Sequence, residues 1–137
     1  MELQVGVKIF LKNKDGKYLL LERSEAKYPD ANGRWDIVGG RINPGTPLLE
    51  NLKREVREET GLEITGEPRL VYAQDIIRTG KRHVVRLSYA GDADGEPNLD
   101  TEENTAYQWL SLQEIKNHKN LDVFVKEIVD KNLISQL

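Results

Sequence analysis

The chain has 137 residues, a formal net charge of −3 and no cysteine. This length predicts one domain spanning residues 1–137, with room for a buried core. The lack of cysteine excludes disulfides and cysteine-ligated zinc, and the small negative charge argues against a broad nucleic-acid-binding surface. We expect no membrane span, because no run of about 18 apolar residues occurs. The N-terminus lacks the pattern of a signal peptide, which fits a cytoplasmic protein.

The pattern of apolar residues alternates between strand and helix periods along the chain. In chain order, the expected elements are strands over 3–11, 18–23 and 35–40, a helix over 47–60, strands over 69–78, 81–91 and 106–112, and helices over 111–118 and 121–134. The strands over 69–78 and 81–91 are expected to join through Thr79-Gly80. Ser111 is expected to be an N-cap, with Glu114 completing a capping box. Strands interleaved with helices predict an α/β (α+β) fold, with a mixed sheet flanked by helices.

The helix expected over residues 47–60 has start and stop signals. Thr46 is a suitable N-cap, Pro47 suits the first helical position, and Gly61 suits a left-handed cap after the last turn. The expected apolar stripe consists of Leu48, Leu49, Leu52 and Val56, and the opposite, solvated side carries Glu50, Arg54 and Arg57.

Three glutamates gather on one part of this helix. Glu55, Glu58 and Glu59 are spaced i, i+3 and i+4, and two of them border the apolar stripe rather than the solvated side. Like charges so close together disfavour one another, and negative charge near a helix C-terminus opposes the helix dipole. A divalent cation such as Mg²⁺ or Mn²⁺ would resolve the conflict. Spacing alone does not separate this hypothesis from an ordinary acidic helix face.

The segment from residue 40 to residue 62 resembles the signature of the Nudix hydrolases. The signature is glycine, five residues, glutamate, seven residues, then arginine, glutamate, aliphatic, any, glutamate, glutamate, any, glycine and aliphatic. The matching positions are Gly40, Arg54, Glu55, Val56, Glu58, Glu59, Gly61 and Leu62. Thr46 stands where the family has its first glutamate, and this departure puts efficiency in doubt more than metal binding.

The resemblance implies a Nudix-type α/β/α sandwich that hydrolyses a phosphoanhydride in a nucleoside diphosphate linked to another group. It implies Mg²⁺, with Mn²⁺ as an alternative, held by Glu55, Glu58 and Glu59 near the Gly39 carbonyl. Arg54 would orient a glutamate by ion pairing. A glutamate from a later loop would complete the metal site or act as the base, and we expect this to be Glu103, with Glu102 in reserve.

Several residues are candidates for binding the substrate. Arg23, at the end of an expected strand, is the best placed to grip phosphates, and Arg34, Arg41, Arg78 and Arg86 are further candidates. Trp35 is a candidate for stacking on a nucleobase, although a tryptophan in such a place more often packs in the core. Tyr28 and Tyr72 are weaker stacking candidates.

The small-molecule substrate remains open among several nucleotides. A nucleoside triphosphate, standard or oxidised, fits a short chain without insertions, and ADP-ribose or a nucleotide sugar is the alternative. Thr46 keeps open a nucleotide sensor that does not cleave its ligand, and a structural domain with an acidic helix would bind no metal. The sequence does not decide between a monomer and a homodimer.

Overall fold

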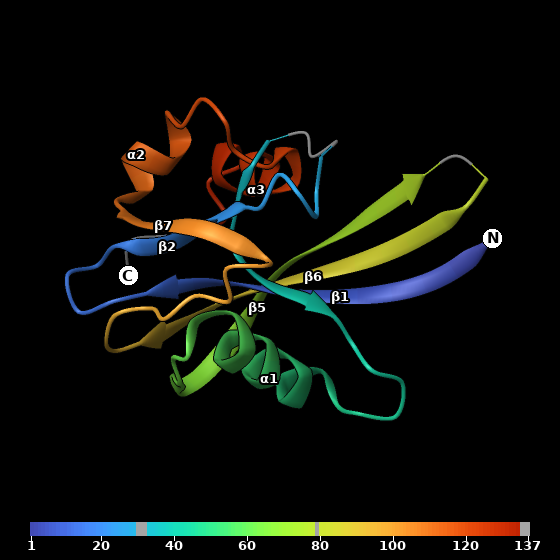
Figure 1. Cartoon of the computed structure of the whole chain (residues 1–137), viewed down its shortest axis with the longest axis horizontal. Helices are drawn as coiled ribbons and strands as arrows, with labels where there is room; N and C mark the ends of the chain where they lie inside the picture. The colour runs from blue at the N-terminus through green and yellow to red at the C-terminus, as the bar shows by residue number, and fades with distance from the viewer. Residues whose placement is uncertain (30–32, 79, 135–137) are drawn as a thin grey trace.

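The computed structural model describes residues 1–29, 33–78 and 80–134, which form one mixed, seven-stranded sheet between helices (Figure 1). The strands are β1 (Glu2–Lys12), β2 (Tyr18–Arg23), β3 (Trp35–Asp36), β4 (Val38–Arg41), β5 (Ile64–Arg78), β6 (Arg82–Ala93) and β7 (Asn104–Leu110). The helices are α1 (Leu48–Thr60), α2 (Leu112–Lys116) and α3 (Val123–Asp130). The predicted mixed sheet flanked by helices is confirmed.

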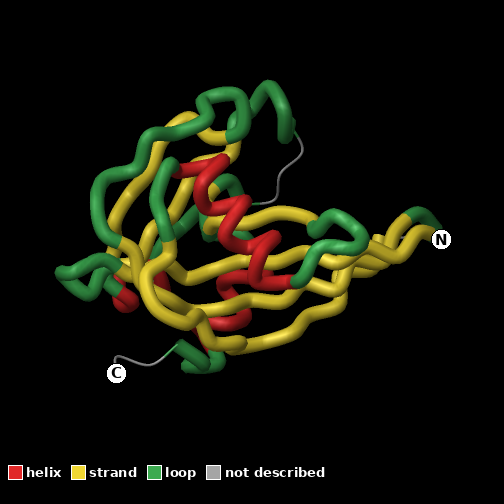
Figure 2. Tube along the Cα trace, turned by 90° about the horizontal axis from the view of Figure 1, so that it is seen from below, coloured by secondary structure: helices red, strands yellow, loops and turns green. Residues whose placement is uncertain are grey.

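The sheet branches at its central strand, β1. One edge of β1 pairs in parallel with β6 along its whole length, and β5 follows β6 in antiparallel pairing. The other edge is shared, since β4 pairs with its middle and β2 joins it at Lys12. β2 continues outward to β3 and β7. Figure 2, seen from the α1 side, shows the strands curling beneath that helix.

Two apolar cores lie on opposite faces of the sheet. Ile9 and Leu11 of β1 pack with Leu52 and Val56 of α1, whereas the intervening Phe10 packs in a second core with residues of α2 and α3. All these side chains are fully buried. Successive residues of a strand face opposite sides, so Phe10 lies on the other face of the sheet from Ile9 and Leu11. None of the helices in the described ranges is long and apolar enough to cross a membrane.

Several element predictions were wrong in their bounds. The strand expected over residues 35–40 is interrupted at Ile37, because β3 pairs with β2 whereas β4 pairs with β1. The Ile37 amide donates to Asp36 Oδ1 at this crossing instead of joining a ladder. The helix expected over 121–134 is shorter at both ends: Asp122 accepts from two amides and caps the start of α3, and Asn132 adopts a left-handed φ of 57° just beyond its end.

The hairpin of β5 and β6 extends beyond the helices beside the first residues of β1 (Figure 1). β5 begins five residues before the predicted start, at Ile64, and its pairing with β6 contains two register shifts. We call its outer part, residues 74–78 and 82–86, the β-arm. Arg78 pairs with Arg82 at its end. Thr79, in the predicted hairpin turn, lies outside the described residues.

Candidate active site

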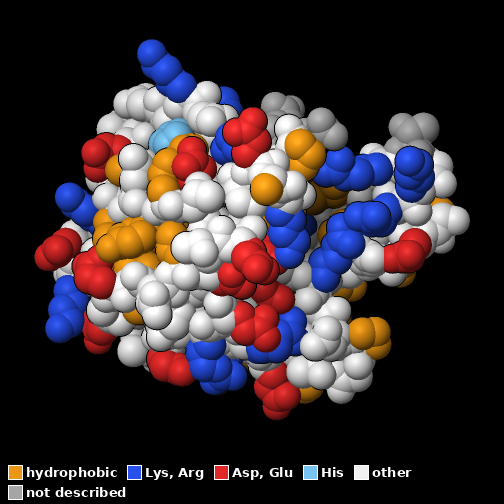
Figure 3. All heavy atoms as spheres, in the orientation of Figure 1, with side chains coloured by type: hydrophobic (Ala, Val, Ile, Leu, Met, Phe, Trp, Pro, Cys, Tyr) orange, Lys and Arg blue, Asp and Glu red, His pale blue; other side chains and the backbone are white. Residues whose placement is uncertain are grey.

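A cleft of about 800 Å³ lies between the sheet, the C-terminal half of α1 and the β-arm. Both charge signs line it. Its acidic residues are Asp36, Glu55, Glu58, Glu59, Asp100 and Glu103, and its basic residues are Lys8, Arg23, Arg41, Arg78, Lys81, Arg82 and Arg86. Figure 3 shows acidic side chains at the middle of this face and basic side chains beside them, on the strands of the β-arm. The cleft is therefore electrostatically divided.

The loop before α1 is fastened by a buried asparagine. The predicted N-cap role of Thr46 is wrong: α1 begins at Leu48, with Pro47 at the N-cap and no capping side chain. Asn51 instead donates to the carbonyls of Thr46 and Pro47 at 2.8 and 2.9 Å, and its Oδ1 accepts from the Asn43 amide at 2.9 Å. This side chain connects the loop to the helix and compensates for the missing cap.

Arg54 turns back across the helix instead of pointing into solvent as predicted. Its guanidinium donates to Asn51 Oδ1 at 2.6 Å, to Glu55 Oε1 at 2.9 Å and to the Arg41 carbonyl at 3.2 Å. Glu58 lies 3.7 Å from its Nε. One cation thus pairs with two of the three glutamates and contacts β4 as well.

The two glycines of β4 make room for the helix carboxylates. Gly39 has a φ of +147°, and a Cβ there would lie 2.0 Å from the Val7 carbonyl oxygen. A Cβ at Gly40 would lie 2.7 Å from Glu55 Oε2. The backbone conformation at the first glycine strongly disfavours any other residue. The second leaves the space that the Glu55 carboxylate fills.

Glu59 is held from two other elements. Its Oε1 accepts from the Gly39 amide at 2.8 Å and its Oε2 accepts from Asn104 Nδ2 at 3.0 Å. Burial raises the pKa of Glu59 to about 7, although Lys8 and the two hydrogen bonds act in the opposite direction. Glu59 therefore changes charge near neutral pH and connects α1 to β4 and β7.

This raised pKa predicts a pH-dependent stability for the metal-free protein. Between about pH 4.5 and 7 the folded state holds a proton at Glu59 that the unfolded state releases, so the free energy of unfolding falls as pH rises through this window. We expect Glu59→Gln to remove on the order of 3 kcal/mol of this decline, as measured by urea unfolding in EDTA. Glu50→Gln, which changes an exposed carboxylate of the same helix, is the control. Equal pH slopes for Glu59→Gln and the unchanged protein would contradict the assignment.

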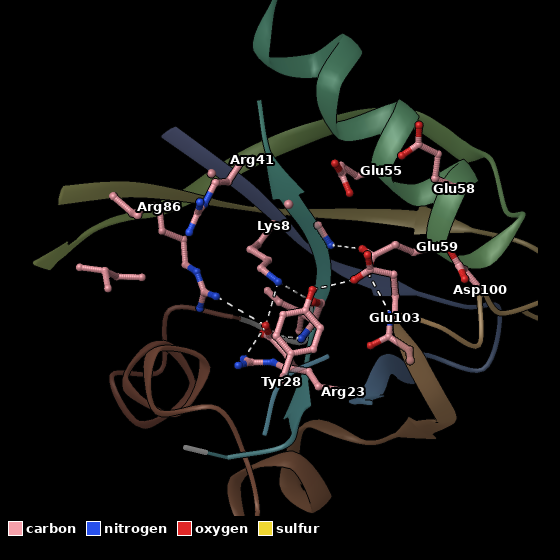
Figure 4. Close-up of a pocket in the computed structure, with 18 of the residues that line it drawn as sticks. Lys8, Arg23, Tyr28, Arg41, Glu55, Glu58, Glu59, Arg86, Asp100 and Glu103 are labelled. Atoms are coloured by element: carbon pink, nitrogen blue, oxygen red, sulfur yellow. Dashed lines mark hydrogen bonds and ion pairs between the residues drawn. The ribbon is translucent and has the colours of Figure 1, made fainter. Parts of the chain in front are cut away.

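Glu103 lies beside Glu59 in the cleft (Figure 4) and already has two partners. Its carboxylate accepts from the Tyr28 hydroxyl at 2.6 Å and from Lys27 Nζ. Burial would raise the pKa of Glu103, but the bonds from Lys27 and Tyr28 outweigh it and hold the pKa below its usual value. Glu103 is therefore ionised at neutral pH.

The floor of the cleft is a buried network of charges. Asp36 is within 2.8 Å of Lys8 and 2.7 Å of Arg23, and Arg86 approaches it at 3.5 Å. Asp122 pairs with both arginines, at 2.9 Å from Arg86. Burial would raise the pKa of Asp36, but Lys8, Arg86 and Arg23 together hold it well below its usual range. These three cations are thus already paired within the fold.

Comparison with known proteins identifies the family of this chain. The sequence model of the NUDIX domain matches residues 2–131. The chain belongs to the Nudix family.

Curated Nudix relatives and solved structures agree with this assignment. The CTP pyrophosphohydrolase of Escherichia coli K12 is 32% identical over 102 residues, which cover 74% of this chain and 71% of that one. Nucleoside triphosphatase NudI of the same strain is 30% identical over 126 residues, covering 82% and 85%. The MutT protein from Methanosarcina mazei Go1 superposes with a TM-score of 0.80 at 26% identity, covering 94% of this chain and 91% of that one. The chain is a Nudix pyrophosphohydrolase, and the predicted Nudix fold is confirmed.

Nudix hydrolases generally use divalent metal ions, and the donor set of this cleft suits a hard cation. Gly39, Glu55, Glu58, Glu59 and Glu103 all line the cleft and offer oxygen atoms. Across the described residues, no group of three acidic or histidine side chains already surrounds one point. The side chain of Glu58 is 63% exposed, and its contact with Arg54 is long, at 3.7 Å. The residues therefore fit a divalent cation that gathers its ligands as it binds.

The Nudix cleft includes some of the predicted substrate-binding residues and leaves out others. Arg23 and Arg41 line it. Arg34 does not, because its guanidinium donates to the carbonyls of Arg23 and Tyr28. Trp35 also lies outside the lining and packs against the second core, with its ring centroid 5.6 Å from that of His118. Arg34 and Trp35 therefore make contacts within the fold and do not line the cleft.

Sequence reasoning missed three groups of this Nudix site. Lys8 and Asp36 sit on the cleft floor, and Asn104 holds Glu59. A lysine among the apolar residues of β1, and an aspartate just before the apolar pair Ile37-Val38, were usable signals because both are expected to be buried and paired. Nothing local marked Asn104, whose partner is 45 residues away.

Proposed function

We propose that the chain hydrolyses a nucleoside triphosphate to a nucleoside monophosphate and pyrophosphate, with Mg²⁺, or alternatively Mn²⁺, as cofactor. The observation that carries this proposal is the divided cleft, where glutamates able to hold a metal lie beside a group of cations able to bind phosphate. Two relatives are named for triphosphate substrates, CTP pyrophosphohydrolase and nucleoside triphosphatase NudI, which supports the same choice.

The residues have separate tasks in this reaction. Glu55 and Glu58 would hold the cation with Glu59, and Arg54 would orient Glu55 through their 2.9 Å ion pair. When bound, the cation would neutralise part of the phosphate charge and lower the pKa of a bound water molecule. The water oxygen forms the new bond to phosphorus, the bridging P–O bond breaks, and pyrophosphate leaves with the electron pair.

Glu103 is our candidate for the base that takes the proton from water. It is ionised at neutral pH, as a base must be. Lys27 and Tyr28 occupy its oxygens, so one of these bonds has to open before a water molecule can replace it. Glu103 would also complete the metal site if it turned toward the helix. For both roles the Glu103 carboxylate has to leave Lys27 or Tyr28.

A substrate panel tests the proposal. Standard and oxidised nucleoside triphosphates, nucleoside diphosphates, ADP-ribose and nucleotide sugars are incubated with Mg²⁺, Mn²⁺ or EDTA, and the products are separated by ion-exchange chromatography. We expect equal amounts of nucleoside monophosphate and pyrophosphate from a triphosphate, and none in EDTA. Turnover confined to ADP-ribose or sugars would contradict the triphosphate, and metal-dependent binding without turnover would indicate a sensor.

A further inference from the structure

Among the described residues, four cations on the cleft wall lack ion-pair partners, unlike the three on its floor. Arg41 ends β4, Arg78 ends β5, and Lys81 and Arg82 lead into β6. Within the described parts of the chain, none of these four side chains has a carboxylate at ion-pair distance or a hydrogen bond. Unpaired cations that line a cleft are available to a ligand.

The strand pairing places these cations on one face. Arg78 of β5 is directly opposite Arg82 of β6, and the next pair facing the same way is Ile76 with Val84, which also lines the cleft. On the opposite side of β1, Arg41 is in register with Gly6, another lining residue. Three strands therefore contribute positive charge to a single wall.

Crowding makes this wall electrostatically unfavourable without a ligand. Burial and the neighbouring Arg82 lower the pKa of Arg41, and Arg78 adds to the effect. Glu2 is the acidic residue that opposes it, and this residue is exposed. An anion on the wall would relieve the repulsion among the arginines.

The wall begins beside the acidic half of the cleft. Arg41 directly follows Gly40, which contacts Glu55, and the Arg41 carbonyl accepts from Arg54. Figure 4 shows Arg41 and Arg86 on one side of Lys8, with Glu55 on the other. A phosphate chain bound at the glutamates therefore has the wall within reach.

We propose that Arg41, Arg78, Lys81 and Arg82 bind the phosphate that the metal does not clamp, so that the cleft selects three linked phosphates over two. This inference rests on the proposed function and specifies how its substrate is chosen. Guanidinium groups bind phosphate through paired hydrogen bonds, which suits arginine to the task. The nucleobase has less to bind to, because Tyr28 is the aromatic residue among the described lining residues and its hydroxyl is bonded to Glu103. Charge, rather than the base, then dominates recognition.

Binding of inorganic phosphate chains tests this without catalysis. Calorimetric titration in the presence of Mg²⁺ compares tripolyphosphate with pyrophosphate for the unchanged protein and for Arg78→Gln/Arg82→Gln. We expect the double variant to lose about tenfold or more in affinity for tripolyphosphate and less than about threefold for pyrophosphate. Arg69→Gln is the matched control, since it removes an exposed arginine of the same strand outside the cleft. Arg78→Lys/Arg82→Lys keeps the charge and is expected to recover part of the loss.

Steady-state kinetics then tests whether a nucleotide uses the same wall. The ratio of kcat/KM for a nucleoside triphosphate to that for its diphosphate is expected to fall about tenfold in Arg78→Gln/Arg82→Gln. An unchanged ratio together with unchanged tripolyphosphate affinity would overturn the inference. If the unchanged protein turns over no nucleotide, but tripolyphosphate affinity still depends on Arg78 and Arg82, the proposed function fails and the anion-binding wall stands.

Discussion

Glu58→Gln is expected to lower kcat by about 10²- to 10³-fold while leaving the fold intact. Glu58 projects from α1 into the cleft, its side chain is 63% exposed, and its nearest charged partner is Arg54 at 3.7 Å. Glutamine keeps the size of the side chain but removes the negative charge that a divalent cation requires. The loss should therefore appear in catalysis and not in stability.

The measurement is turnover of the best substrate across a Mg²⁺ titration, beside urea unfolding. We expect a weaker metal dependence for Glu58→Gln and a free energy of unfolding within about 0.5 kcal/mol of the unchanged protein. Glu50→Gln, an equal charge change in the first turn of α1 and outside the cleft lining, should leave both quantities unchanged. If Glu58→Gln kept more than half of the activity, Glu58 would not be a metal ligand.

The part of this site that the sequence predicts consists of residues on consecutive turns of one helix. Glu55, Glu58 and Glu59 share a face because of their spacing, and the cleft does receive all three. Helical periodicity placed Arg54 on the solvated side, because periodicity does not include the partners of a side chain. In the structure, the Arg41 carbonyl and Asn51 Oδ1 accept hydrogen bonds from the guanidinium and hold it against the cleft. Local periodicity gives the face of a helix, and long side chains reach beyond it.

The strands show the same limit. Alternation found β1, but it could not show that residues 35–40 change neighbours at Ile37, since pairing partners are set by distant segments. Arg23 was predicted as a phosphate ligand, and the structure ties it to Asp122, 99 residues away. When the partner of a cation is so distant along the chain, the sequence around the cation does not show that it is paired.

Asp36→Asn is expected to lower the free energy of unfolding by about 3–5 kcal/mol, because it leaves buried cations without their counter-charge. Lys8 and Arg23 lie within 2.8 Å of the Asp36 carboxylate, and their side chains are 16% and 19% exposed. Asp122 alone would then pair with the two arginines, and Lys8 would lose its ion pair with Asp36. Asp130→Asn is the control, since Asp130 pairs with Lys126 at 3.0 Å on the surface and should contribute less than about 1 kcal/mol.

A second change distinguishes lost charge balance from lost packing around Asp36. Adding Lys8→Met to Asp36→Asn removes one of the stranded cations and should recover part of the stability, measured as a double-mutant cycle by urea unfolding at pH 7. Because the pKa of Asp36 is lowered by folding, its contribution is complete above the usual pKa of about 4 and is lost as pH falls further. The difference between Asp36→Asn and the unchanged protein should therefore shrink in acid. A loss as small as that of Asp130→Asn would show that solvent compensates the floor cations, which would then be free to bind phosphate together with the wall.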